Sequence, residues 1–207
     1  MGDQRSEAPL RRNSRSNLDR LLGEMIERPE AQEQLTQEVI HHFGETRAVM
    51  ALDMSGFSRT TQQRGIVAFL LMIHQMKLIA GPTVEANDGL VVKAEADNLY
   101  CMFESVEGAV RASRALIERL GTVNLLLPEE RRLYAAIGIG YGTILNVDEE
   151  DMFGDEVNLA SKLGEDVAER GQILLTPAAQ TELPPGLKTR SETISIAGLS
   201  VTYYRLA

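Results

Sequence analysis

One carboxylate in the sequence stands where a strand runs into a glycine turn. Residues 49–53 are apolar up to Asp53 and predict a buried strand, and the turn Ser55-Gly56-Phe57-Ser58 follows it. The backbone N–H groups of such a turn can face a phosphate, with the acid at the mouth of the loop. An Asp before Ser-Gly is also the composition of a plain turn. The chemical interpretation therefore needs a second acid and a phosphate ligand further along the chain.

Other polar residues lie at spacings that could complete such a site. Asp97 and Asn98 stand between two predicted strands, which is the composition of a hairpin turn. Asn158 and Lys162 are four residues apart in a predicted helix, so they project from one face. Every second residue of one predicted strand is a glycine, at Gly138, Gly140 and Gly142. We expect another chain or a ligand to approach the backbone of that strand closely.

The composition limits the class of protein. The chain has 207 residues, enough for one domain or one domain with a short appendage. Its 43% hydrophobic and 25% charged residues are ordinary for a soluble globular protein, and the net charge of −9 argues against general nucleic-acid binding. The single cysteine, Cys101, fits a reducing compartment. The longest apolar run, from Ile66 to Ile73, is shorter than a membrane span, and the N-terminus has no signal-peptide pattern. We expect a cytoplasmic protein without membrane insertion.

The N-terminal part predicts a tail and two helices. Residues 1–16 are rich in Arg and Ser and predict a disordered, solvated tail, whose arginines are Arg5, Arg11, Arg12 and Arg15. Asn17 is a candidate N-cap for an amphipathic helix that Pro29 interrupts, and Gly44 closes a second helix. We expect residues 17–44 to form a helical extension that packs on the main domain, on itself or on a second subunit.

Residues 45–207 predict one α+β domain. Strands are expected over residues 47–53, 83–86, 89–95, 98–103, 133–146 and 173–176, with a closing hairpin over 187–206. Helices are expected over residues 64–79, 106–120 and 155–168 and from Pro177, and Gly81-Pro82 should end the first of them. Hairpins mixed with crossovers indicate a ferredoxin-like plan with a central, mostly antiparallel sheet flanked by helices.

Three segments read together resemble the catalytic domain of class III nucleotidyl cyclases, the adenylate and guanylate cyclases. They are Leu52–Ser58, Lys93–Asp97 and Asp151–Leu163, and the resemblance covers about Arg47 to about Leu206. The resemblance implies a homodimer with its sites between two protomers. It also implies conversion of ATP or GTP into a 3′,5′-cyclic nucleotide and pyrophosphate for intracellular signal transduction.

The resemblance gives roles to the strand-end acids and their turn. Asp53 and Asp97 match the two metal-binding aspartates of the family, and the Met54 carbonyl is a natural additional ligand. Two Mg²⁺ or Mn²⁺ ions per site would activate the ribose hydroxyl and neutralise the leaving group. The turn Ser55-Gly56-Phe57-Ser58 would bind the β- and γ-phosphates.

The resemblance also gives roles to the base site and the helix. Lys93 and Asp151 match the base-selecting pair of the family, and a Lys donor with an Asp acceptor suits adenine, which predicts ATP as the substrate. Asn158 would orient the ribose, and Lys162 would stabilise charge on the α-phosphate in the transition state. These two residues are the predicted catalytic residues.

Four positions depart from the pattern of the family. Lys162 replaces the usual Arg and lacks its bidentate fork, Ala96 replaces the usual Gly, and no lysine stands near Gly198. Glu95 replaces an apolar residue and could be an added metal ligand or pair with Lys93. The leading hypothesis is therefore an adenylate cyclase, and the alternative is a catalytically weak or inactive cyclase-homology module that dimerises and binds nucleotide or regulates. A diguanylate cyclase would need a Gly-Gly-acid-acid-Phe signature, which the sequence lacks.

Overall fold

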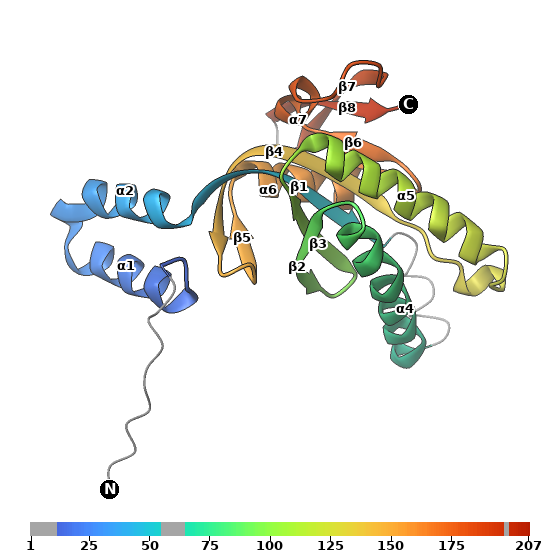
Figure 1. Ribbon diagram of the computed structural model, residues 1–207, viewed down its shortest axis with the longest axis horizontal. Coiled ribbons are helices and arrows are strands. Elements are labelled where there is room, and N and C mark those ends of the chain that lie inside the picture. Colours follow the sequence, from blue (N-terminus) through green and yellow to red (C-terminus); the bar gives the residue numbers. More distant parts are fainter. Residues whose placement is uncertain (1–11, 55–64, 197–198) are drawn as a thin grey trace, which may run out of the picture.

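The computed structural model describes residues 12–54, 65–196 and 199–207. Within these residues one eight-stranded sheet has the strand order β2-β3-β1-β4-β6-β8-β7, and β5 pairs with β4 (Figure 1). Only the β4–β6 pair among the described strands is parallel. The predicted α+β domain with a mostly antiparallel sheet is confirmed.

The elements have the following bounds. The strands are β1 (Gly44–Asp53), β2 (Gly89–Glu95), β3 (Asn98–Phe103), β4 (Ala136–Val147), β5 (Asp151–Phe153), β6 (Ile173–Leu175), β7 (Thr189–Ile196) and β8 (Leu199–Leu206). The α-helices are α1 (Arg15–Glu27), α2 (Gln32–Phe43), α4 (Ile66–Glu85), α5 (Val106–Asn124), α6 (Asp155–Lys162) and α7 (Pro177–Thr181).

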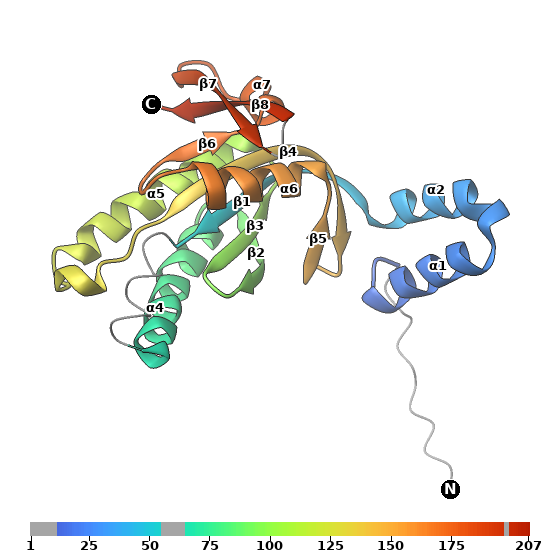
Figure 2. The same cartoon turned by 180° about the vertical axis from the view of Figure 1, so that it is seen from behind.

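Strand β1 lies inside the sheet, between β3 and β4, and is covered on both faces. Met50 and Leu52 point into the core formed with α4 and α5, while Val49 and Ala51 point into a second cluster with α6. Figure 1 shows α4 and α5 on one side of the sheet, and Figure 2 shows α6 on the other. Because both faces are buried, the strand is apolar until Asp53, where it leaves the core.

The glycine positions of β4 accommodate a helix of the same chain. A Cβ atom at Gly138 would lie 2.0 Å from the Ala160 carbonyl oxygen, and one at Gly140 would lie 2.5 Å from the Glu156 carbonyl oxygen. Both carbonyls belong to α6, which therefore packs directly on the backbone of β4. The prediction that another chain or a ligand approaches this strand is wrong, because α6 occupies that face.

The N-terminal helices form a hairpin that packs on itself and on the main domain (Figure 1). Their shared cluster consists of Leu18, Leu21, Leu35, Val39, Phe43 and Val147, the last from β4. Helix α1 begins at Arg15, and the Ser14 side chain accepts a hydrogen bond from the Asn17 N–H at 3.3 Å. The predictions that Asn17 is the N-cap and that the tail extends to residue 16 are therefore wrong at this boundary, because Ser14 caps the helix earlier.

Helix α4 is longer than predicted. It continues through Gly81 and Pro82 to Glu85, so the predicted stop at Gly81-Pro82 and the extended segment after it are wrong. Val84 is fully buried, and the Thr83 hydroxyl donates to the Ile79 carbonyl at 2.6 Å, so packing and a side-chain bond support the last turn. By length and composition α4 could cross a membrane. Only 28% of its most apolar segment is buried inside the protein. The absence of membrane insertion therefore stays a prediction.

The predicted helix over 155–168 consists of two parts. Helix α6 ends at Lys162, and a π-helical turn, Leu163–Val167, follows it. Gly164 lies in this turn, where a Cβ atom would be 2.8 Å from the Ala51 carbonyl oxygen of β1. The turn therefore brings the residues after α6 against the central strand, close to its carboxyl end.

Candidate active site

The two predicted metal-binding acids lie together where β1 and β3 meet. Asp53 is directly opposite Asn98 in the β1–β3 register, and the Met54 N–H donates to the Asp97 carbonyl at 3.2 Å. Asp97 follows Ala96 in the turn between β2 and β3. The structure thus brings Asp53, Met54 and Asp97 to one end of the sheet, as predicted. The phosphate-binding turn Ser55–Ser58 lies outside the described residues.

The turn before Asp97 has a left-handed backbone. Ala96 has a φ of 48°, a conformation that glycine adopts without steric cost. For a residue with a Cβ atom this conformation costs about 1 kcal/mol. Glycine suits this position because it adopts a positive φ without strain. Ala96 forms the same turn at that small cost.

The surroundings of Asp53 are strongly negative. Burial raises the pKa of Asp53 to about 6, and the neighbouring carboxylates Asp97, Glu165 and Asp166 add to the shift. Glu165 and Asp166 lie in the π-helical turn, and the sequence analysis missed them because their approach depends on that turn. Repulsion among these acids would be relieved by a cation.

The donor set at this end of the sheet fits a magnesium or manganese ion. Two carboxylates completed by phosphate oxygens are a usual set for Mg²⁺, and no larger group of His, Cys, Asp or Glu side chains suited to a metal occurs among the described residues. The buried Asn98 Oδ1 has no hydrogen-bond partner in the described part of the chain. Asn98 pairs with Asp53, so an unsatisfied amide oxygen lies beside the acids. Asp53 and Asp97 would hold the ion, with Asn98 adjacent.

The predicted base-selecting pair is formed. Lys93 Nζ lies 2.9 Å from Asp151 Oδ1, although the two residues are on β2 and β5. The same ammonium group lies 3.2 Å from Glu95 Oε1 and over the Tyr100 ring at 5.1 Å. Burial opposes the charge of Lys93, but hydrogen bonds to Asp151 and Glu95 raise its pKa above the ordinary value. Of the two roles considered for Glu95, the structure shows the pairing with Lys93.

Asp151 begins strand β5, a short strand that the sequence analysis did not predict. The connection from β4 contains Asp148 and Glu149 with φ values of 54° and 62°, the left-handed pair of a tight hairpin. Asp151 Oδ2 lies 2.5 Å from Arg15 Nη2 of helix α1. The prediction that Arg15 belongs to a solvated tail is therefore wrong. Burial opposes ionisation of Asp151, but hydrogen bonds from Lys93, Arg15 and the Met152 N–H lower its pKa.

The predicted catalytic residues lie on the exposed side of α6. Asn158 and Lys162 are both exposed, as their spacing predicts for one helix face. Lys162 Nζ pairs with Asp166 at 2.8 Å, and this pairing raises the pKa of Lys162. The charge of Asp166 also raises the pKa of Asp53. The end of α6 therefore lies near the end of β1 that carries the acids.

Tyr100 connects the base site to the helix that carries Asn158. Its hydroxyl lies 3.2 Å from Ser161 Oγ of α6 and donates to Glu165 Oε1 at 3.0 Å. The sequence analysis missed this residue. Strand alternation could have placed it on the same face as Asn98, but its partners depend on the tertiary fold.

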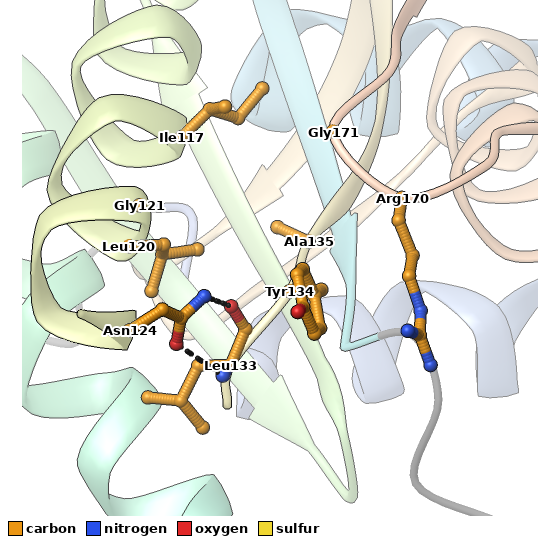
Figure 3. A pocket seen from close by; sticks show the side chains of 9 residues that line it. All are labelled: Ile117, Leu120, Gly121, Asn124, Leu133, Tyr134, Ala135, Arg170 and Gly171. Carbon is orange, nitrogen blue, oxygen red and sulfur yellow. Dashed lines mark hydrogen bonds between the residues drawn. The ribbon is translucent and has the colours of Figure 1, made fainter. Parts of the chain in front are cut away.

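A separate cavity of about 290 Å³ lies between the end of α5 and the start of β4 (Figure 3). Asn124 makes two hydrogen bonds to the backbone of Leu133 there, and the Arg170 guanidinium stacks over the Tyr134 ring at 4.6 Å. Its described lining contains none of the predicted site residues. This cavity is therefore distinct from the candidate active site.

The fold is that of class III nucleotidyl cyclase catalytic domains, as three solved structures show. The adenylate/guanylate cyclase/hydrolase from Silicibacter pomeroyi covers 79% of this chain and 97% of its own, with a TM-score of 0.65 and 22% identity. The adenylyl cyclase CyaB from P. aeruginosa covers 79% and 95%, with a TM-score of 0.65 and 18% identity. A rhodopsin-guanylyl cyclase core with converted specificity, solved with ATPαS, covers 79% and 96%, with a TM-score of 0.67 and 16% identity.

Two curated proteins are similar to this chain in sequence. "Putative adenylate cyclase 3" of Rhizobium meliloti (strain 1021) is 30% identical over 129 residues, which are 62% of this chain and 22% of that protein. "Serine/threonine-protein kinase pkn2" of Myxococcus xanthus is 26% identical over 130 residues, which are 63% of this chain and 15% of that protein. The chain thus spans less than a quarter of either relative. No protein-family model matches it.

These similarities confirm the resemblance that the three sequence motifs indicate. The chain has the fold of the adenylate and guanylate cyclase catalytic domains, and its sequence is similar to a protein named as an adenylate cyclase. Adenylate and guanylate cyclases both occur among the matches, so the preference for a base has to come from the residues of the site.

Proposed function

We propose that this chain is an adenylate cyclase domain that converts ATP into 3′,5′-cyclic AMP and pyrophosphate for intracellular signalling. The contact between Lys93 and Asp151 carries the proposal. Adenine offers a ring nitrogen that accepts a hydrogen bond and an amino group that donates one, and this pair supplies one donor and one acceptor. The solved structure of a rhodopsin-guanylyl cyclase core with ATPαS supports binding of an adenine nucleotide by this fold.

The residues of the chain take separate parts in the proposed reaction. Lys93 and Asp151 hold the base, Asn158 orients the ribose, and Lys162 balances charge that develops on the α-phosphate. Asp53 and Asp97 hold the divalent ions, Mg²⁺ or Mn²⁺. When bound, such ions lower the pKa of the attacking 3′-hydroxyl and neutralise the leaving pyrophosphate.

The proposed enzyme is a homodimer located in the cytoplasm. Asn158 and Lys162 are exposed, as expected for residues that act at a shared interface. Helix α4 also exposes a set of apolar side chains, which are Ile66, Val67, Leu70, Leu71 and Leu78. Exposed apolar surface of this kind marks contact with another protein or with a membrane, and we propose that a second copy of the chain covers it. The buried, free Cys101 suits a reducing compartment.

The test is the formation of cyclic nucleotide by the purified protein. With Mn²⁺ and ATP we expect cyclic AMP, with less product from GTP, and we expect Asp97→Asn to remove it without unfolding the protein. Specific activity should fall on dilution as the dimer dissociates. The absence of cyclic product from either nucleotide at high protein concentration would sink the proposal.

A second candidate is the weakly active or inactive module that binds nucleotide. The pairing of Lys162 with Asp166 favours it, because the cation is held by a carboxylate in place of a phosphate. In that case the protein would bind ATP and dimerise while forming no cyclic AMP. Binding and turnover measured on the same preparation separate the two candidates.

A further inference from the structure

Asp151, the proposed acceptor for the base, already has three hydrogen-bond donors. Lys93 Nζ and the Met152 N–H both lie 2.9 Å from Oδ1, and Arg15 Nη2 lies 2.5 Å from Oδ2. The Asp151 side chain is only 18% exposed. Among the residues that the structure describes, the only hydrogen-bond donor to Oδ2 is the Arg15 guanidinium of the N-terminal helix, whereas both donors to Oδ1 come from the catalytic domain.

The position of Arg15 is defined by its surroundings. Its guanidinium also lies 5.6 Å from the centre of the Phe153 ring, so it contacts two alternate residues of β5. It stands at the start of α1, which Ser14 caps. Buried Leu18 and Leu21 fix α1 against α2 and, through Val147, against β4. The packing of the N-terminal hairpin therefore sets whether the guanidinium reaches Asp151.

We propose that Arg15 is an affinity-determining residue of the base site, whose guanidinium competes with the amino group of the nucleobase for Asp151 Oδ2. The inference rests on the proposed function, because it takes Asp151 as the base acceptor. A guanidinium makes a stronger, charge-assisted hydrogen bond than a neutral amino group. ATP therefore binds fully only when α1 withdraws Arg15, and the hairpin lowers nucleotide affinity while it is docked.

Nucleotide binding and docking of the N-terminal hairpin are coupled in both directions. If the docked hairpin weakens nucleotide binding, bound nucleotide must weaken docking of the hairpin by the same factor. Helix α1 should then exchange its amide hydrogens faster when a nucleotide is bound. Most bound ligands instead slow exchange, so the sign of this change is diagnostic.

The experiment measures binding of α,β-methylene ATP with Mg²⁺ by calorimetry, since this analogue cannot release pyrophosphate. Arg15→Ala should bind it roughly fivefold more tightly than the wild type, the size expected for one exposed ion pair and one cation–π contact. The matched control is Arg20→Ala, which removes an arginine of α1 that pairs with Glu24 and Glu38 and leaves Asp151 untouched. Its affinity should equal that of the wild type.

Hydrogen exchange of the unaltered chain gives a second measurement that needs no variant. Saturation with the analogue should speed exchange over residues 15–27. Slower or unchanged exchange there, or an Arg15→Ala affinity equal to or weaker than the wild type, overturns the inference. An Arg15→Lys variant that keeps the charge should fall between the wild type and Arg15→Ala.

The outcomes separate this inference from the proposed function. If the wild type forms cyclic AMP and Arg15→Ala binds the analogue no more tightly, only the inference fails. If no variant forms cyclic AMP but Arg15→Ala binds more tightly, the cyclase proposal fails and the inference stands. If neither protein binds the analogue, the inference fails, and the cyclase proposal fails with it only if cyclic AMP is also absent.

Discussion

Asp53→Asn should stabilise the metal-free protein while it removes activity. The pKa of Asp53 is raised from its usual 3.8 to about 6 by burial and by neighbouring carboxylates. The folded state therefore holds the Asp53 proton more tightly than the unfolded state does. Stability from this residue is highest below the unfolded pKa and is lost as the pH rises through about 6. An Asn side chain is neutral throughout and avoids that loss.

The magnitude follows from the size of the shift. A difference of about 2 pH units corresponds to about 3 kcal/mol for a group fully shielded from water. Asp53 is only partly buried, and solvent screening reduces the effect to about 1 kcal/mol. For a chain of this length we expect a melting temperature higher by about 2–4 °C at neutral pH. The gain should be clearly smaller at about pH 4.5, where the folded-state carboxyl is protonated but the unfolded-state carboxyl is still largely ionised.

The assays are thermal unfolding and urea unfolding with a chelator present, carried out at both pH values. Asp19→Asn is the control, because it changes one exposed carboxylate of α1 to an amide and should alter stability by less than about 0.5 kcal/mol. Added Mn²⁺ should stabilise the wild type more than Asp53→Asn. Reduced stability of Asp53→Asn at neutral pH, or a gain of equal size at both pH values, would refute the account of an acidic cluster built for a cation.

Two further predictions concern α6. Gly138→Ala should destabilise the fold by about 1–3 kcal/mol or more in urea unfolding, because its Cβ atom would meet the Ala160 carbonyl at 2.0 Å. The control Gly121→Ala, in α5 with no atom within 4 Å of the new Cβ, should stabilise the protein by up to about 1 kcal/mol, and equal effects of the two changes would contradict the packing described. Lys162→Arg should raise the rate of cyclic AMP formation several-fold, because the guanidinium can contact two phosphate oxygens. A lower rate in the same assay would mean that Lys162 does not face the phosphate.

The sequence predicts the sheet and the acids at its end well. The strand before Asp53 is apolar because both of its faces are buried, and that pattern is visible without a structure. The Lys93–Asp151 contact was expected only through the resemblance to the cyclases. Periodicity carries no information about which side chains of distant strands meet.

The errors have specific physical causes. Pro82 predicts the end of a helix. The burial of Val84 and of the other core residues of α4 outweighs the free-energy cost of a proline inside the helix. The alternating glycines of β4 required a close neighbour, and local sequence could not say that α6 of the same chain is that neighbour. Arg15 stands in a polar, charged stretch, so only the tertiary position of α1 connects it with Asp151.

Direct contact between the backbones of α6 and β4 has a consequence for sequence drift. The distance of α6 from the sheet is set by main-chain atoms at Gly138 and Gly140, because a Cβ atom there would meet the Ala160 and Glu156 carbonyl oxygens. Core residues elsewhere can therefore change size over generations without moving Asn158 or Lys162 relative to β4. Tolerance to substitution should thus be high in the side chains around the helix and almost absent at the two glycines beneath it.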